Sequence, residues 1–164
     1  PIIGYNYGAG MFHRLKRTYW MAVGMATAIV VAGMVFGLSA PGMIARAFTT
    51  DPGLIGETVR CLSISLLCFG VVGFQVVSTT LFQSLGRAGA SIFLSLTRQV
   101  IFLIPALLIL PTRYGLDGVW ASFPVSDMFA TAVTAGMIWW QLREINRLAA
   151  TSAGKPLENP ESII

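Results

Sequence analysis

Long apolar stretches dominate the hydrophobic pattern of the chain, and short groups of polar and basic residues separate them. Four such stretches lie at residues 19–38, 62–85, 92–110 and 119–140. Each is close to the ~20 apolar residues that a helix needs to cross ~30 Å of hydrocarbon. The pattern therefore predicts an all-α membrane protein with four transmembrane helices.

The segments between and around these stretches complete the predicted organisation. We expect residues 1–18 to form a cytoplasmic loop with a basic segment, and residues 19–148 to form the transmembrane region. Asp51 and Pro52 are typical of a helix N-cap and the first helical position. The polar, proline-containing residues 149–164 predict a disordered cytoplasmic tail.

Glycines and prolines suggest where the helices turn, bend and meet. Residues 86–89 predict a tight turn between the second and third helices, and residues 111–118 separate the third from the fourth. Gly33 and Gly37 have the spacing of a close-packing motif. Residues 70–73 begin and end with glycine, which would allow a bend or the close approach of a neighbouring backbone.

The composition supports the membrane assignment. Hydrophobic residues make up 55% of the chain and charged residues only 11%, whereas a soluble domain carries about a quarter charged residues. The net charge of +4 could suggest nucleic acid as a partner. However, a nucleic-acid binder clusters Lys and Arg on one face of a soluble fold. Here they lie between apolar stretches, so we expect the lipid bilayer, and no nucleic acid, as the partner.

The basic residues also predict how the chain is oriented. Cytoplasmic loops of membrane proteins are enriched in Lys and Arg. Eight of the 11 basic residues fall on one side of the predicted helices, which places both the N-terminal segment and the C-terminus in the cytoplasm. The eight are Arg14, Lys16, Arg17, Arg87, Arg98, Arg143, Arg147 and Lys155, and the opposite side has Arg46, Arg60 and Arg113.

Asp127 is the most informative polar residue, because a carboxylate in the middle of a membrane helix costs about 2.5–3.5 kcal/mol on insertion scales. Pro124 removes a backbone hydrogen bond three residues earlier, and Thr131 and Thr134 continue the same helix face. One interpretation is a proton or cation site, or part of a substrate path. The alternative is a structural carboxylate that caps a neighbouring helix or pairs with an arginine.

Two further helices carry polar residues that could line a cavity. Gln75 and Thr79 belong to a polar stripe on the second predicted helix, and hydrogen bonding between helices is the simpler interpretation for both. Arg98 lies about two turns into the third helix. It could extend back to the interface, or it could pair across helices with an inward-facing acid. Pro105 predicts a kink in this helix.

The residues do not predict an enzyme. The sequence has no paired carboxylates, no Ser/His/Asp set and no His/Cys cluster with metal-ligand spacing. Cys61 and Cys68 would be about 10 Å apart on one helix, too far for a disulfide. His13 lies in a basic segment and is expected to be solvated. We therefore expect no catalytic residue, no cofactor and no bound metal.

Several motifs resemble the multidrug and toxic compound extrusion (MATE) family of transporters. The opening residues 1–10, followed by a basic stretch, resemble the motif after the eighth helix of bacterial members. Residues 82–87, residues 97–99 with Pro105, and residues 115–120 resemble the family in the same order. In the opening motif the residues that carry the resemblance are Gly4, Tyr5, Asn6 and Gly8.

The resemblance implies that the four helices correspond to helices nine to twelve of twelve. They would then be part of the C-terminal six-helix bundle, and the N-terminal helices of the same transporter would be missing partners. It further implies an antiporter of the bacterial inner membrane that exports cationic, amphipathic drugs in exchange for Na⁺ or H⁺ by alternating access. Some members bind the coupling cation through an acid in the tenth helix, where this chain offers only Gln75.

Two alternatives remain open at this stage. A flippase for lipid-linked saccharides has a related architecture, but it would line its cavity with several basic residues, and only Arg98 lies near the membrane interior. A non-transporting four-helix scaffold subunit is the other alternative. The candidate residues for an ion or substrate path are Asp127, Gln75, Thr131, Arg98 and Thr79.

Overall fold

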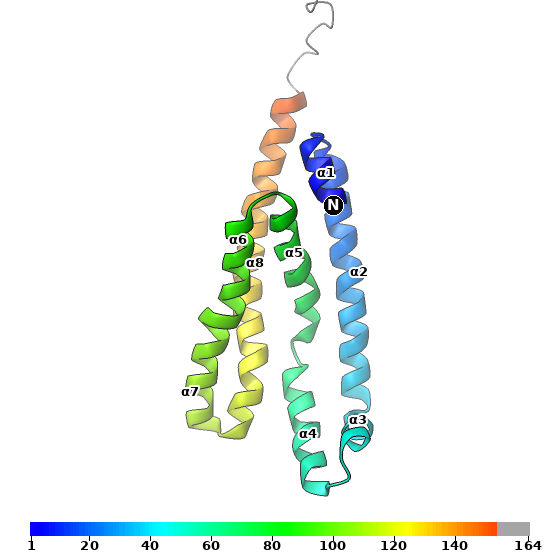
Figure 1. The fold of residues 1–164 in the computed structure, drawn as a ribbon, viewed down its shortest axis with the longest axis vertical. Helices are drawn as coiled ribbons and strands as arrows, with labels where there is room; N and C mark the ends of the chain where they lie inside the picture. Colours follow the sequence, from blue (N-terminus) through cyan, green and yellow to red (C-terminus); the bar gives the residue numbers. More distant parts are fainter. Residues whose placement is uncertain (154–164) are drawn as a thin grey trace, which may run out of the picture.

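A computed structural model of the chain describes residues 1–153 and shows a long, narrow bundle of helices (Figure 1). No strand occurs within these residues. The long helices run alternately up and down, so that neighbours in the chain are antiparallel (Figure 1). The elements are α1 (Ile2–Gly8), α2 (Phe12–Ser39), α3 (Pro41–Phe48), α4 (Pro52–Ser65), the 3₁₀ segment η1 (Phe69–Val71), α5 (Val72–Ser84), α6 (Ala88–Leu96), the π-helical segment η2 (Thr97–Leu103), α7 (Ile104–Tyr114) and α8 (Leu116–Ala153).

Two helical stretches are long and apolar enough to cross a membrane on their own. They are α2, with a mean hydropathy of 2.2, and the continuous stretch Ala88–Tyr114, with a mean hydropathy of 2.1. The pair α4 and α5 meets the same condition when it is taken together, with a bend of 49° at its break. The 38-residue α8 is long enough, but Asp127 and the Ser and Thr residues around it make this helix too polar to meet the condition.

The ends of several helices differ from the prediction. The expected N-terminal loop contains α1, and α2 already begins at Phe12. The connection expected at residues 111–118 consists of Gly115 alone, since α7 ends at Tyr114 and α8 begins at Leu116. The positive φ of Gly115, 57°, turns the chain between the two helices. The predicted disorder from residue 149 is wrong for its first five residues, since α8 continues to Ala153; residues 154–164 lie outside the described part.

The predicted start of α4 is confirmed. The Asp51 carboxylate accepts a hydrogen bond of 2.8 Å from the Gly53 N–H, and Pro52 occupies the first helical position. The side-chain oxygen thereby satisfies one of the backbone donors that the first turn leaves unpaired. The tight turn around Gly86, with φ of 73°, is also observed.

Glycine brings α2 and α5 close together, although not at the pair that the sequence favoured. A Cβ on Gly73 would lie 2.8 Å from the Thr27 Cα and backbone N, so the two backbones touch. A Cβ on Gly33 would meet no atom within 4 Å, and one on Gly37 would meet only the Leu66 side chain. The contact predicted for residues 70–73 is therefore confirmed. Of the predicted pair, Gly37 lies close to Leu66, whereas Gly33 faces no other residue of the described part.

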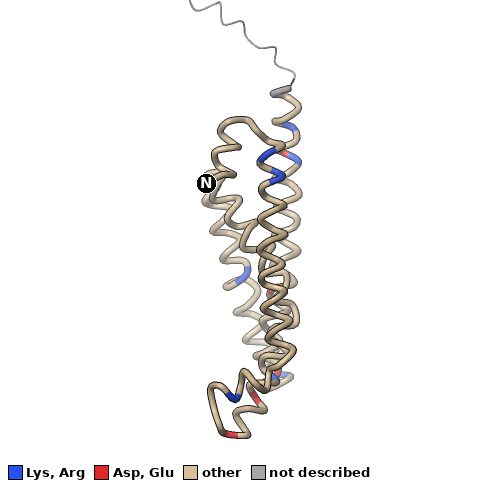
Figure 2. The backbone as a smooth tube through the Cα atoms, turned by 90° about the vertical axis from the view of Figure 1, so that its right-hand side faces the viewer, with Lys and Arg blue, Asp and Glu red and all other residues tan. Residues whose placement is uncertain are grey.

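Basic residues gather at the end of the bundle where α8 extends farthest (Figure 2). Polar contacts join three elements there. The Lys16 ammonium donates to the Asn146 side-chain oxygen at 2.7 Å and thus ties α2 to α8. Arg87, in the turn after α5, donates to the Gln141 amide oxygen at 2.8 Å and to the Glu144 carboxylate at 2.6 Å. Its guanidinium also lies 5.4 Å from the ring centre of Trp140. This basic end of the bundle is thus held to α8 by charged hydrogen bonds.

Candidate functional site

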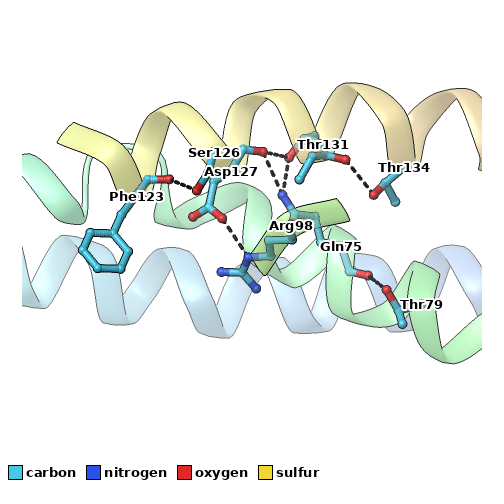
Figure 3. Close-up of polar contacts among 9 residues, drawn as sticks. Gln75, Thr79, Arg98, Phe123, Ser126, Asp127, Thr131 and Thr134 are labelled. Atoms are coloured by element: carbon cyan, nitrogen blue, oxygen red, sulfur yellow. Dashed lines mark hydrogen bonds and ion pairs between the residues drawn. The ribbon is translucent and has the colours of Figure 1, made fainter. Parts of the chain in front are cut away.

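The candidate site is built around an ion pair between Asp127 of α8 and Arg98 of η2 (Figure 3). The Arg98 Nε–H donates to the Asp127 Oδ1 atom at 2.8 Å. The Asp127 side chain is only 8% exposed, whereas that of Arg98 is 32% exposed. Such a carboxylate needs a charged or hydrogen-bonding partner to remain ionised away from water, and Arg98 provides it.

Gln75 of α5 joins the same site from a third helix. Its amide nitrogen donates to the backbone carbonyl of Asp127 at 2.9 Å and to the Thr131 hydroxyl at 2.6 Å. The Thr131 hydroxyl in turn donates to the Asp127 carbonyl at 2.6 Å. These bonds fix the backbone of Asp127 from α5 while Arg98 holds its carboxylate, so three helices position one residue.

Backbone irregularities next to prolines place these side chains. Pro124 has no N–H to donate to the carbonyl one turn earlier, and it stands within α8 just before Asp127. On the other helix, the π-helical turn that contains Arg98 ends immediately before the turn of Pro105. The proline ring would clash with a carbonyl in a regular α-helix, and a π-helical segment widens the turn at this point. Such segments occur frequently at functional sites.

Two cavities lie on either side of Arg98. The smaller, about 170 Å³, is lined by Gln75, Thr79 and Thr134 among others. The larger, about 440 Å³, is lined by Asp127, Ser126, Phe123 and Leu103. Arg98 and its neighbour Gln99 line both cavities. Arg98 therefore borders two partly polar pockets, both of which are open at the surface of the described residues.

The structure brings together all five residues predicted for an ion or substrate path. Asp127, Arg98, Gln75 and Thr131 are linked by hydrogen bonds, and Thr79 lines the smaller cavity, with its hydroxyl on the Gln75 carbonyl at 2.9 Å. Of the two interpretations of Arg98, pairing with an inward-facing acid is the one observed. For Asp127, the structure therefore shows one of the structural roles considered above, namely pairing with an arginine.

The sequence reasoning missed two parts of the site and its surroundings. Gln99 and Ser126 line the larger cavity, and the only signal for them was their position next to Arg98 and Asp127. The hydrogen bonds of Arg87 to Gln141 and Glu144 were missed as well. The spacing of Gln141 and Glu144 could have indicated that these two residues contact the same partner, because residues three apart share a helix face.

Two residues of the opening motif pack against their neighbours. A Cβ on Gly4 would lie 2.9 Å from the Ser84 carbonyl oxygen, so glycine allows α1 to approach the end of α5. Asn6 is 6% exposed, and its backbone carbonyl accepts the Met11 N–H at 2.8 Å. Tyr5 is exposed, and a Cβ on Gly8 would meet nothing within 4 Å. Only Gly4 and Asn6 of the four motif residues thus have a visible packing role.

In the described part of the chain, acidic, histidine and cysteine residues do not gather into a metal site. Within residues 1–153, no group of three or more His, Cys, Asp or Glu side chains could hold an ion. Cys61 and Cys68 are both free thiols. The charged chemistry of the site is therefore that of the Asp127–Arg98 pair.

Long apolar helices around an ion pair and polar cavities define a class, the helical bundles of membrane proteins, in which ionisable residues face the bundle interior. Comparison with known proteins identifies the family within this class. The MatE family model matches residues 1–108 of the chain. The chain belongs to this family, the multidrug and toxic compound extrusion transporters, which are multi-pass membrane proteins.

Individual relatives agree with this assignment. The probable multidrug resistance protein NorM of Caulobacter vibrioides is 27% identical over 157 residues, which cover 91% of this chain and 33% of NorM. The structure of the MATE multidrug transporter DinF-BH in complex with rhodamine 6G is similar with a TM-score of 0.79 and 37% identity, over 85% of this chain and 31% of that chain.

A more distant structure shares the fold alone. It is that of a MOP superfamily transporter from Pyrococcus furiosus, which is 24% identical with a TM-score of 0.79 over 90% of this chain and 33% of that chain. The chain thus spans about a third of the length of the relatives that it matches.

Proposed function

We propose that the chain forms part of a secondary active exporter of cationic, amphipathic drugs or toxic compounds. Export would be driven by exchange for Na⁺ or H⁺ through alternating access. The observation that carries this proposal is the pairing of the buried Asp127 with the half-buried Arg98 beside two cavities in a bundle of the MatE family. The rhodamine 6G complex of DinF-BH supports a dye-like, amphipathic substrate.

Asp127 is our candidate for the residue that responds to the coupling ion. A carboxylate that is held by one guanidinium and faces a cavity can exchange that partner for a proton or a cation. The exchange would release Arg98 and change the contacts between η2 and α8, and a two-state element of this kind is what ion coupling requires. The lipid-linked saccharide flippase is less well supported, since Arg98 is the only basic residue that lines either cavity within residues 1–153.

Replacing Asp127 with asparagine in the full-length transporter is expected to reduce ion-driven efflux of rhodamine 6G by about tenfold or more, because one charge-assisted hydrogen bond is lost. The measurement is dye efflux from proteoliposomes under an imposed Na⁺ or H⁺ gradient. The control is Asp117→Asn, which removes an aspartate from the same helix but breaks only its pair with Arg60 at the far end of the bundle. Normal efflux by well-expressed Asp127→Asn protein would remove Asp127 from the mechanism.

We further propose that the protein lies in the bacterial inner membrane with the C-terminus in the cytoplasm. Seven of the 11 basic residues support this orientation and three oppose it, once Arg98, which pairs with Asp127 inside the bundle, is left out. In a full-length background without other cysteines, we expect Thr50→Cys to react with a membrane-impermeant maleimide in intact spheroplasts. Ala150→Cys should react only after permeabilisation. The reverse labelling pattern would show that the orientation is inverted.

A further inference from the structure

Basic residues line an open groove at the start of α2, apart from the site described above. The groove has a volume of about 520 Å³, and its lining residues are His13, Lys16, Arg17 and Trp20. Spacings of three and four residues place all four on one face of the helix. α2 begins at the end of the bundle where α8 extends farthest (Figure 1). We call this feature the basic groove.

The basic groove carries positive charge that the described residues leave uncompensated. Neither Lys16 nor Arg17 forms an ion pair with any acid in the part of the chain that the structure describes. The carboxylate of Glu144, at the same end of the bundle, is already paired with Arg87. The Lys16 ammonium donates to the Asn146 side-chain oxygen at 2.7 Å, and this neutral amide orients the ammonium without removing its charge. The groove therefore presents a fixed positive charge.

The backbone of α2 adds to this charge. The helix has no side-chain hydrogen bond at its N-cap and no acid in its first turn, although a helix N-terminus carries a partial positive charge that anions stabilise. Its first two turns instead contain His13, Arg14, Lys16 and Arg17, and cations are favoured at the opposite end of a helix. Sequences that break a local rule in this way commonly do so at functional sites. A bound anion would compensate both the side chains and the dipole.

The depth of the groove indicates where such an anion lies. Trp20 is 54% exposed, and tryptophan is enriched at the boundary between hydrocarbon and water. From Trp20 to Ser39 the helix rises about 28 Å, which matches the ~30 Å of the hydrocarbon. Lys16 and Arg17 then lie about 5–6 Å beyond that boundary, within a headgroup layer that is about 5–7 Å thick on each side. Both cations are therefore level with the phosphates of the bilayer.

We propose that the basic groove is a binding site for the headgroup of an anionic phospholipid. Lys16 and Arg17 hold the phosphate, His13 donates to the outer part of the headgroup, and Trp20 lies where the acyl chains begin. Asn146 is a positioning residue, since it holds the Lys16 ammonium in place. Basic pockets beside transmembrane helices on the cytoplasmic side bind such headgroups, and the orientation proposed above places the groove on that side. The site does not depend on drug export or on Asp127.

A photoactivatable phosphatidylglycerol, with its reactive group on an acyl chain, tests this site. It is added in trace amount to phosphatidylcholine vesicles that contain the full-length transporter, and labelling of the α2 peptide is quantified by mass spectrometry. Excess unlabelled phosphatidylglycerol, phosphatidylcholine or inorganic phosphate at constant ionic strength competes in parallel samples. The variants are Lys16→Gln and Arg17→Gln, because glutamine keeps a donor for Asn146 while it removes the charge.

Arg14→Gln is the matched control. It removes the same charge from the same turn of α2, but Arg14 lies outside the basic groove, and its guanidinium contacts the Met11 sulfur. Arg14 and Arg17 are both exposed, so neither substitution disturbs the packing of the bundle. Attraction to the general charge of this end would make the two variants equal, whereas a defined groove makes them differ.

We expect Lys16→Gln and Arg17→Gln each to reduce labelling of the α2 peptide by about fivefold, and the double variant by more than about tenfold. Arg14→Gln should reduce it by less than about twofold, and only unlabelled phosphatidylglycerol should compete. Equal losses for Arg14→Gln and Arg17→Gln would overturn the groove as a site. Equal competition by phosphatidylcholine would overturn the preference for an anionic headgroup, and displacement by inorganic phosphate would show that the ligand is a soluble anion instead of a lipid.

Discussion

Replacing Gly73 with alanine is expected to destabilise the bundle by about 1–3 kcal/mol, the usual cost of inserting a methyl group into a packed contact. The new Cβ would lie 2.8 Å from the Thr27 Cα and backbone N and 2.9 Å from the Ala26 carbonyl carbon. These are backbone atoms and cannot rotate aside, so α2 and α5 must separate. Gly73→Leu should be worse, and full-length protein should be lost to aggregation or degradation.

The measurement is the midpoint of thermal unfolding of purified full-length protein in detergent. Gly24→Ala is the matched control, because a Cβ there meets no atom within 4 Å and alanine favours the helix over glycine. Its midpoint should equal or exceed that of the wild type. Equal midpoints for Gly73→Ala and Gly24→Ala would show that α2 and α5 do not approach as closely as the structure indicates.

Removing either partner of the Asp127–Arg98 pair is expected to destabilise the protein unequally. Arg98→Gln leaves a carboxylate that is only 8% exposed without its cation, and the cost should be about 1–3 kcal/mol, between that of exposed and buried pairs. Asp127→Asn leaves a guanidinium that is 32% exposed to the cavities, where water can solvate it. The second substitution should therefore cost less.

The double variant Arg98→Gln/Asp127→Asn tests whether the two side chains stabilise the protein through their interaction. It removes both charges, so no charge remains uncompensated, and its unfolding midpoint should lie above that of Arg98→Gln. The midpoints of the three variants and the wild type form a double-mutant cycle. A double variant that loses the sum of the single losses would mean that the two side chains do not interact energetically.

Much of the site was predictable because charge in an apolar helix is costly. Asp127 is an ionisable residue within an apolar segment, and this energetic cost indicated that it faces inward. For Arg98 the sequence left open whether it extends back to the interface or pairs with an inward-facing acid. Gln75 and Thr131 could be predicted as a polar stripe but not as partners of Asp127. Their contact depends on how α5 packs against α8, and spacing along a single helix does not contain this information.

Backbone geometry was the part that the sequence could not supply. Pro105 predicted a kink, yet the structure accommodates it through a seven-residue π-helical segment that also contains Arg98. Several backbone conformations accommodate a proline in a helix, and the sequence does not indicate which of them forms. The close contact at Gly73, and the absence of one at Gly33, likewise depend on how α2 packs against its neighbours, which the spacing of glycines does not determine.

The length of α8 has a consequence outside the bundle. Its 38 residues extend about 57 Å at 1.5 Å per residue, nearly twice the ~30 Å thickness of the hydrocarbon. A continuous helix is stiff over this distance, so its last turns stand beyond the other helices as a rigid rod (Figure 1). A helical protein fused in phase after Ala153 would therefore be held at a fixed angle, which makes this end suitable for attaching an imaging marker.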